Sequence, residues 1–386
     1  MNRSIGEFAE PWALRLPRPG FILRRLLPRR QYAPAGEVLR LEPVLARYGM
    51  PPRGPLVVQR GGKRNEAWVL HNPRGRLLLK RYKTTLTRAQ IVHEHSILEH
   101  LEAADFPAPR LVRDEAGSTL VEHEGRFYVI FDYLTGYARF DDYYYLPPQT
   151  HRLQTAVGRA LGRLHNALNG FIPRGENING FSSLTGERER DLNWYLARLE
   201  RARAYADRLP GGDPMRALLE ERGGWLGEQL QEISAGLTAA NPERGIIHGD
   251  YGPNNMLFKP GAPLVVLDFE LARLDWLLAD VVAALSTTAV KVGTRADWTR
   301  ILTGYLSERR IPPEQLCLLP QVWQFQALRR AILCGEQYLA QPRPALFQEA
   351  TRRIRRAAWA AARHAELASL AELSERGRPA ERIPAA

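Results

Sequence analysis

The chain has 386 residues, of which 45% are hydrophobic, and its 54 Lys and Arg outnumber its 42 Asp and Glu, for a formal charge of +12. The length favours two lobes or domains around a large core, and the chain lacks the uncharged apolar run of about eighteen residues that would predict a transmembrane helix. We expect no signal peptide, and the two cysteines, Cys317 and Cys334, are too few for a disulfide framework, so the expected compartment is the cytoplasm.

Residues 1–55 form a basic arm with nine prolines and ten arginines. Prolines at this density block long helices, so the sequence predicts irregular chain with one short helix around residues 38–48. The basic and apolar piece 20–30 either packs on the body of the protein or contacts an anionic surface or protein. Stable membrane insertion and nucleic-acid binding are not expected. The basic balance suits anionic partners and argues against a polycationic one.

A strand-rich region follows the arm. Apolar runs separated by turns predict three strands, at residues 56–59, 67–70 and 76–82. The first turn contains Gly61 and Gly62, whose backbone N–H groups can approach a phosphate without a Cβ clash, although such a turn is usually only a hairpin. Lys80 ends the third run, where an inward-facing ammonium needs an anionic partner.

A helix with a capping-box start is predicted from Thr87. Its apolar residues recur at helical spacing, and Glu94 is displaced from that stripe. Glu94 is the candidate partner of Lys80; the alternatives are a solvated helix carboxylate and the use of Lys83 instead. His93 and His95 do not have the His-Glu-x-x-His spacing of a zinc site, so no metal role is expected for them.

A hairpin is predicted over residues 118–131, followed by a connecting segment that contains Asp132 and Tyr133. The cluster Asp141–Tyr145 either lines a substrate pocket or packs between lobes. Most of the remaining chain is predicted to be helical, with a frayed tail at its end. These segments are residues 150–168, 171–240, 271–285, 297–370 and the tail 377–386.

The most informative stretch is residues 245–258, in which two short apolar runs flank a tight polar loop. The loop presents Asp250 and, five residues later, Asn255, and a third apolar run delivers Asp268. Phosphoryl transfer needs a carboxylate at the attacking hydroxyl, with amide and carboxylate oxygens to hold Mg2+ on the nucleotide phosphates. A turn of this composition is common, but the third run, ending in Asp268 at the expected distance, favours a kinase site.

The sequence His248-Gly249-Asp250, together with Asn255 and Asp268, resembles the catalytic and metal-binding loops of the aminoglycoside phosphotransferase family. Choline kinases and type II homoserine kinase are among its relatives. The resemblance implies an α+β, bilobal, protein-kinase-like fold, with a small antiparallel-sheet N-lobe and a larger, mostly helical C-lobe. We expect the N-lobe at residues 56–135 and the C-lobe at residues 136–376.

The resemblance also implies residue roles, with ATP and Mg2+ as cofactors. Asp250 is expected to be the catalytic base, and Asn255 and Asp268 the metal ligands. The expected nucleotide-binding residues all come from the N-lobe: Lys80, Glu94, Gly61, Gly62, Asn65, Asp132 and Tyr133. Asp280 is expected to brace the catalytic loop, and Asp275 to lie on the surface.

The expected function is transfer of the γ-phosphate of ATP to a hydroxyl of a small molecule, such as an amino alcohol, a sugar or an aminoglycoside. The sequence does not identify the acceptor. The alternative is a noncatalytic kinase-like module that binds nucleotide or serves a structural role, which the complete set of site residues disfavours. A protein kinase is disfavoured by Gly249 and by the lack of an Ala-Pro-Glu segment after Asp268.

Overall fold

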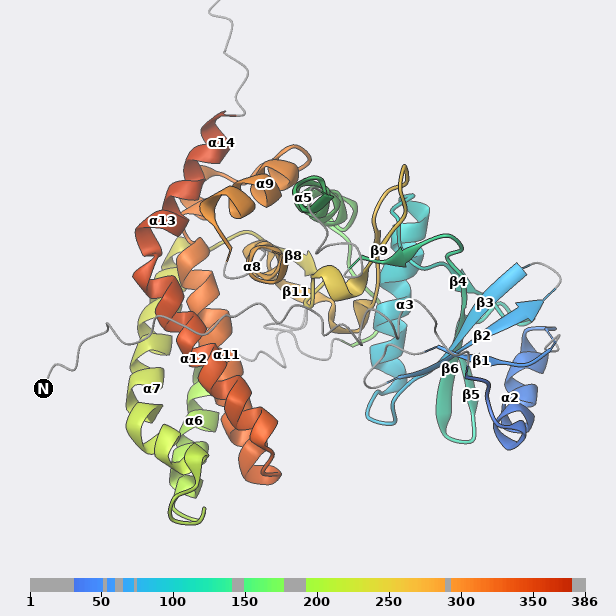
Figure 1. Ribbon diagram of the computed structural model, residues 1–386, viewed down its shortest axis with the longest axis horizontal. Coiled ribbons are helices and arrows are strands. Elements are labelled where there is room, and N and C mark those ends of the chain that lie inside the picture. The colour runs from blue at the N-terminus through green and yellow to red at the C-terminus, as the bar shows by residue number, and fades with distance from the viewer. Residues whose placement is uncertain are drawn as a thin grey trace, which may run out of the picture.

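The computed structural model describes residues 31–50, 54–59, 65–72, 75–140, 149–176, 192–288 and 293–376. Figure 1 shows two lobes, a sheet-containing N-lobe on the right and a mostly helical C-lobe on the left. The α+β bilobal prediction is confirmed. Within the predicted arm, the part before residue 31 lies outside the described residues.

An antiparallel sheet forms the N-lobe. Its order is β1-β2-β3-β6-β4, and β5 pairs with β6. The strands are β1 (Val57–Val58), β2 (Glu66–Asn72), β3 (Gly75–Arg81), β4 (Leu111–Val112), β5 (Val121–His123) and β6 (Arg126–Asp132). The register sets Lys80 of β3 opposite Val129 of β6, near the centre of the sheet.

Two helices pack on the N-lobe sheet. Helix α2 (Ala35–Arg47) buries Leu41, Val44 and Leu45 among the strand side chains, so the later part of the predicted arm belongs to the N-lobe core. Helix α3 (Arg88–Ala103) begins with the predicted capping box, in which Thr87 and Gln90 satisfy each other's backbone N–H groups. The core on the side of α3 is continuous with that of the C-lobe.

Short strands carry the loops of the C-lobe. They are β7 (Ala138–Arg139), β8 (Arg244–Ile247), β9 (Met256–Phe258), β10 (Val265–Val266) and β11 (Arg273–Trp276). β9 lies between β7 and β10, and β8 pairs with β11, all antiparallel. This pairing brings the end of β8 beside the segment that follows β10.

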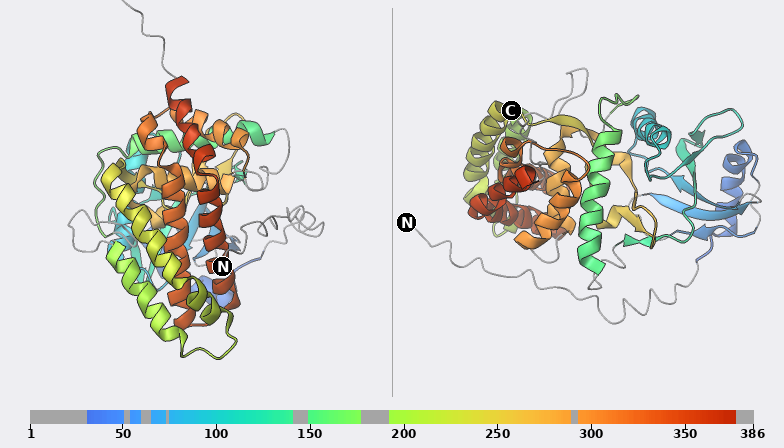
Figure 2. Two further views of the ribbon diagram at one scale, coloured as in Figure 1. Left: turned by 90° about the vertical axis from the view of Figure 1, so that its left-hand side faces the viewer. Right: turned by 90° about the horizontal axis from the view of Figure 1, so that it is seen from above.

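Helices make up the rest of the C-lobe. They are α5 (Gln149–Ala167), α6 (Leu192–Ala206), α7 (Pro214–Ala240), α8 (Leu277–Thr288), α9 (Arg295–Leu306), α10 (Pro313–Leu316), α11 (Leu319–Ala340), α12 (Pro344–Ala362), α13 (His364–Ala368) and α14 (Glu372–Arg376). The longer helices α6, α7, α11 and α12 gather at the end of the lobe away from the sheet, and α5 stands between them and the N-lobe (Figures 1 and 2).

Two glycines allow α5 and α9 to cross closely. A Cβ on Gly158 would lie 1.8 Å from the carbonyl oxygen of Ile301, and one on Gly304 would lie 2.1 Å from that of Thr155. Because backbone cannot yield as a flexible side chain can, these positions require glycine. The crossing fixes α5, whose Val157 carbonyl accepts a hydrogen bond from the Tyr251 hydroxyl in the loop after β8, and whose His165 contacts Asp280 of α8.

Candidate active site

Lys80 and Glu94 form an ion pair between β3 and α3. The Lys80 Nζ lies 3.4 Å from the Glu94 Oε1, and the two side chains are 12% and 4% exposed. Burial acts to lower the pKa of Lys80, but the negative charges of Glu94 and Asp268 outweigh it and raise that pKa. The ammonium group therefore stays charged, and the two residues that the sequence paired are in contact.

A buried network that sequence reasoning missed orients Glu94. The Tyr82 hydroxyl donates to the Glu94 Oε2 at 2.9 Å and lies 3.1 Å from the His95 Nε2. Because the tyrosine proton is committed to Glu94, His95 donates from Nε2, and its Nδ1 accepts from the Thr119 hydroxyl at 2.8 Å. Burial lowers the pKa of His95 to about 3, so the imidazole is neutral in this role.

Asp250 and Asn255 lie together on the loop after β8. The Asn255 amide donates to the Asp250 Oδ2 at 2.9 Å and to the Asp250 carbonyl at 2.8 Å. His248 fixes the turn, since its Nδ1 accepts from the Asp250 N–H at 3.2 Å and its Nε2 donates to the Leu267 carbonyl at 2.7 Å. Burial raises the pKa of Asp250, and the hydrogen bond from Asn255 opposes that shift.

Asp280 braces this loop from the first turn of α8, as predicted. It accepts hydrogen bonds from the backbone N–H groups of His248 at 2.6 Å and Gly249 at 3.0 Å, and lies 3.4 Å from the His165 Nε2. Gly249 has φ +81°, and a Cβ there would lie 2.3 Å from the Leu271 carbonyl oxygen. Only glycine fits this position, which explains the central residue of His248-Gly249-Asp250.

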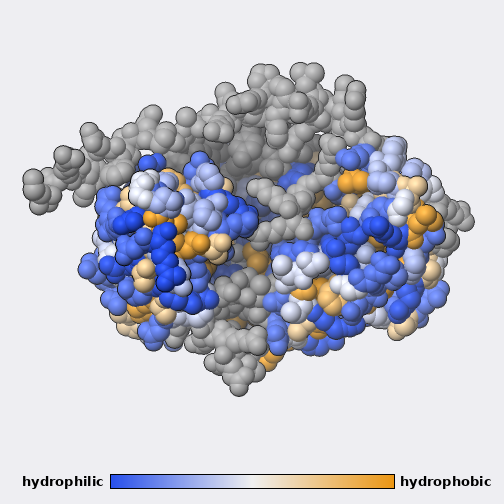
Figure 3. All heavy atoms as spheres, turned by 90° about the horizontal axis from the view of Figure 1, so that it is seen from below, coloured by the Kyte–Doolittle hydropathy of each residue, from blue (hydrophilic) through white to orange (hydrophobic). Residues whose placement is uncertain are grey.

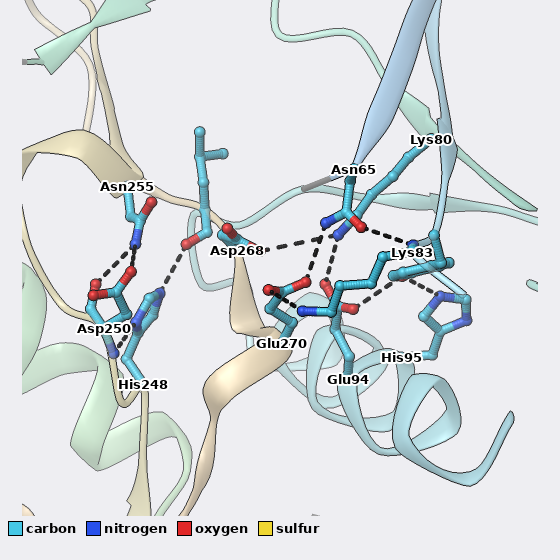
Figure 4. Close-up of polar contacts among 12 residues, drawn as sticks. Asn65, Lys80, Lys83, Glu94, His95, His248, Asp250, Asn255, Asp268 and Glu270 are labelled. Atoms are coloured by element: carbon cyan, nitrogen blue, oxygen red, sulfur yellow. Dashed lines mark hydrogen bonds and ion pairs between the residues drawn. The ribbon is translucent and has the colours of Figure 1, made fainter. Parts of the chain in front are cut away.

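Asp268 follows β10 in the left-handed backbone region, at φ +64°. The neighbouring Leu267 N–H donates to the Asn255 carbonyl at 2.8 Å, which holds the two predicted metal-ligand segments together. The Asp268 Oδ1 lies 3.9 Å from the Lys80 Nζ, and its side chain is 43% exposed. Figure 4 shows Asp268 between the Asp250–Asn255 pair on one side and Lys80 on the other.

Glu270 joins the two lobes and was given no role by sequence reasoning. It accepts from the Lys83 Nζ at 3.1 Å and from the Asn65 amide at 3.1 Å (Figure 4). The Asn65 Oδ1 accepts from the Lys83 N–H at 3.1 Å. Burial acts to raise the pKa of Glu270, but the positive charge of Lys80 and these hydrogen bonds outweigh it and lower that pKa. Asn65 thus links the two lobes here, and nucleotide binding by Asn65 stays a prediction.

The structure gives fewer contacts for the other residues that were predicted to bind nucleotide or to line a substrate pocket. Gly61 and Gly62 lie outside the described residues, as does the cluster Asp141–Tyr145. In the segment after β6, the Asp132 N–H donates to the Arg110 carbonyl at 3.1 Å and the Tyr133 N–H to the Arg76 carbonyl at 3.2 Å. These two N–H groups are used within the protein, and nucleotide binding by Asp132 and Tyr133 stays a prediction.

Two predictions after Asp268 are wrong. Residues 273–276 form a strand, β11, where a helix was expected from residue 271, and Asp275 is 1% exposed where a surface residue was expected. Pairing with β8 places Asp275 opposite Gly245, inside the lobe. There it accepts from the Arg273 Nε at 3.1 Å and Nη2 at 2.9 Å, with the Arg329 Nη1 at 3.8 Å.

Comparison with known proteins identifies the family. A model described as the phosphotransferase enzyme family matches residues 56–316, more than half of the chain. The chain belongs to this family. Homoserine kinase from Allorhizobium ampelinum is 25% identical to this phosphotransferase over 288 residues, covering 74% of this chain and 81% of the relative. Homoserine kinase from Rhodopseudomonas palustris is 26% identical over 311 residues, covering 79% and 86%.

Solved structures share the fold of the phosphotransferase at low identity. A microcompartment-associated aminopropanol kinase has a TM-score of 0.52 and 19% identity, covering 87% of this chain and 99% of its own. Ethanolamine kinase from Plasmodium vivax has a TM-score of 0.59 and 13% identity, covering 87% and 92%. A spectinomycin phosphotransferase in complex with ADP and spectinomycin has a TM-score of 0.57 and 12% identity, covering 90% and 100%.

These likenesses confirm the predicted family, fold and enzyme class: the match to the family model makes the chain a phosphotransferase, and the solved structures share its fold. The homoserine kinases extend over most of this chain and most of their own length. Among the described residues of the phosphotransferase, no helix combines the length and apolar character needed to cross a bilayer.

Proposed function

We propose that this phosphotransferase transfers the γ-phosphate of ATP to a small-molecule hydroxyl, with Asp250 as the catalytic base. The observation that supports it most is the approach of Lys80 to Asp268, 3.9 Å apart across the two lobes. Lys80 comes from the sheet of the N-lobe and Asp268 from the segment beside the catalytic loop. A charged ammonium facing a partly exposed carboxylate from the other lobe is an arrangement that suits a nucleoside triphosphate and its metal.

Asp250 is the residue that we propose meets the acceptor. Its Oδ2 is held by the Asn255 amide, and its backbone is held by His248, so the carboxylate has a fixed direction. A carboxylate is a weak base toward an alcohol, so it orients the hydroxyl first and takes the proton late, as the new bond to phosphorus forms. Position and charge neutralisation supply most of the acceleration.

Lys80 would bind the phosphates of ATP, kept in place by Glu94. Because Tyr82 and His95 fix the other carboxylate oxygen of Glu94, the ammonium group cannot swing freely. The predicted Mg2+ site fits the residues present: the Asn255 side-chain oxygen and the partly exposed Asp268 carboxylate are both hard oxygen donors. When bound, Mg2+ would neutralise charge on the transferring phosphates.

The acceptor is proposed to be a small hydroxyl compound. The relatives are named homoserine kinase, and structures with the same fold are named aminopropanol and ethanolamine kinases. We carry over from these names only the class they share, a small molecule with a hydroxyl and an amino group. A noncatalytic module would have no chemical use for the oriented Asp250 together with the Lys80–Glu94 pair.

ADP release with Mg-ATP tests the proposal across a panel of amino alcohols, hydroxy amino acids and sugars. We expect an acceptor-dependent signal that the Asp250→Asn variant loses while it still binds ATP. Absence of both turnover and ATP binding in the wild type would contradict the proposal. Equal turnover by Asp250→Asn would reject Asp250 as the base and leave the kinase assignment standing.

A further inference from the structure

Tyr82 contacts both members of the Lys80–Glu94 pair. Its hydroxyl donates to the Glu94 Oε2 at 2.9 Å, and the Lys80 Nζ lies 4.5 Å from the centroid of its ring. An ammonium group within about 6 Å of a ring centroid is attracted to the negative face of the ring, most strongly where water is excluded. Tyr82 is buried, so one residue supports the cation and the carboxylate at once.

The ammonium group of Lys80 has only long ionic contacts with the residues that the structure describes. It lies 3.4 Å from the Glu94 Oε1 and 3.9 Å from the Asp268 Oδ1, whereas a direct hydrogen bond between an ammonium and a carboxylate is about 2.7–2.9 Å long. Lys80 is therefore close to its partners without a short bond to either. A cation held in this way can form short hydrogen bonds to a phosphate at little cost, because it has no strong one to give up.

The other oxygen of Glu94 is held by a buried chain of donors that leads away from Lys80. Tyr82 donates to the Glu94 Oε2, His95 donates from its Nε2 to the Tyr82 oxygen at 3.1 Å, and the Thr119 hydroxyl donates to the His95 Nδ1 at 2.8 Å. All of these bonds are made in only one arrangement of the protons. Figure 4 shows Glu94 and His95 on the same helix, with Lys80 reaching Glu94 from the sheet.

The backbone of Tyr82 is fixed as well. Its N–H donates to the Phe127 carbonyl at 2.9 Å, and its carbonyl accepts from the Arg126 Nη2 at 3.2 Å. Burial, together with the negative charge of Glu94, raises the pKa of the Tyr82 hydroxyl, which therefore remains a donor. The tyrosine is held by the sheet and keeps its proton, so it sets the direction of the Glu94 carboxylate.

We propose that Tyr82 is the positioning residue of the phosphate-binding lysine. By holding Glu94 through its hydroxyl and supporting the ammonium with its ring, it leaves Lys80 ready to move from the two carboxylates to the phosphates of ATP. The inference rests on the proposed function, because it concerns how ATP binds at the same site. Without the tyrosine hydroxyl, Glu94 is free to form a short bond with Lys80, and that bond then competes with the nucleotide.

Two substitutions separate the hydroxyl from the ring, with Tyr128→Phe as the control. Tyr82→Phe keeps the ring but releases Glu94, and we expect the Kd for Mg-ATP to rise roughly 3- to 30-fold, with kcat within about threefold of wild type. Tyr82→Leu also removes the ring and should raise Kd further. Tyr128 is likewise a buried tyrosine of the N-lobe sheet, and its hydroxyl contacts Arg81, so its loss should leave Kd unchanged. A wild-type Kd in Tyr82→Phe would overturn the inference.

A series of ligands shows whether the effect passes through Lys80. Adenosine, AMP, ADP and ATP are titrated by calorimetry, with Mg2+ present, into wild type and Tyr82→Phe. Because adenosine carries no phosphate, its affinity should not change, whereas the affinities for ADP and ATP should fall. An equal loss for adenosine would show that Tyr82 only supports the fold of the N-lobe, and would overturn the inference.

A milder variant decides the question where thermal melts show that Tyr82→Phe is poorly folded. Thr119→Val removes the donor to the His95 Nδ1, which frees the imidazole to change tautomer and take the tyrosine proton away from Glu94. Thr119 is only half-buried, so the fold should tolerate this change. A loss of affinity confined to the phosphorylated ligands would support the inference, and wild-type affinities for all four ligands would overturn it.

The binding measurements also separate this inference from the proposed function. A phosphate-specific loss in Tyr82→Phe or Thr119→Val, in a protein whose wild type turns over no acceptor, supports the role of Tyr82 while the proposed function fails. Turnover by wild type, with nucleotide affinities that these variants do not change, overturns the role of Tyr82 and leaves the kinase intact.

Discussion

The Lys83 Nζ lies 3.1 Å from the Glu270 Oε1, an ion pair that joins the segment after β3 in the N-lobe to the segment after Asp268 in the C-lobe. The side chains are 19% and 11% exposed, so solvent screens the pair only in part. Asn65 donates to the other oxygen of the same carboxylate. Three residues thus fix the spacing between Lys80 and the proposed metal site.

Breaking this link should weaken nucleotide binding more than it lowers turnover. We expect Lys83→Met or Glu270→Gln to raise KM for ATP about 3- to 10-fold, because the closed arrangement of the lobes loses about 1 kcal/mol of support. A double-mutant cycle on KM for ATP measures the coupling. Strict additivity of the two changes would show that the pair does not act as a unit.

Gly249→Ala should destabilise the enzyme and abolish most activity. The added methyl would have to displace the Leu271 carbonyl, at a backbone angle that alanine avoids. We expect a loss of about 3 kcal/mol in the free energy of unfolding. Gly261→Ala is the matched control, because its φ is +76° but nothing lies within 4 Å of the added Cβ. Equal losses for both variants would show that backbone angle alone matters.

Asp280→Asn should lower both stability and kcat. The carboxylate serves the backbone N–H groups of His248 and Gly249, and an amide offers one acceptor oxygen in place of two. Leaving a buried donor unsatisfied costs about 1–3 kcal/mol. Asp105→Asn is the control, because that side chain is fully exposed. Thermal melts and kcat of the three proteins give the comparison.

The effect of Asp280 should also depend on pH. Burial acts to raise the pKa of Asp280, but the hydrogen bond and charge of His165 and the backbone hydrogen bond from His248 outweigh it and lower that pKa. A carboxyl whose pKa is lower in the folded state stabilises the fold fully above its unfolded-state pKa, and this is lost as pH falls through the folded-state pKa. The difference in melting temperature between wild type and Asp280→Asn should therefore shrink in acid. A difference that grows in acid would contradict this assignment.

The fall in activity at low pH should reflect the protonation of Asp250. Burial raises its pKa from an ordinary value of 3.8, so kcat/KM should fall on acidification at a pH above 3.8. Asn255 opposes that shift through its hydrogen bond, and Asn255→Ala should move this fall to higher pH. Profiles of kcat/KM at saturating Mg2+ measure both. If kcat/KM falls at the same pH in Asn255→Ala as in wild type, a group other than Asp250 is responsible for the fall.

Sequence reasoning worked where local pattern and chemistry agree. The apolar run that ends in Lys80 and the capping box before Glu94 led to residues that are indeed in contact. It failed at Asp275. The strand there has only four residues and leads directly into an apolar helix, so its alternation of buried and exposed side chains is too short to recognise in the sequence. The Tyr82 network and the Glu270 link depend on contacts between distant segments, for which the sequence offers only the presence of suitable side chains.

The most direct test of the catalytic assignment combines nucleotide titration and phosphoryl transfer in two variants, Asp250→Asn and Asp268→Asn. The account predicts that Asp250→Asn binds Mg-ATP nearly as well as wild type but transfers phosphate at least about 100-fold more slowly. Asp268→Asn should instead lose Mg-ATP affinity. Wild-type transfer rates in Asp250→Asn, or unchanged Mg-ATP affinity in Asp268→Asn, would contradict the roles assigned to these two carboxylates.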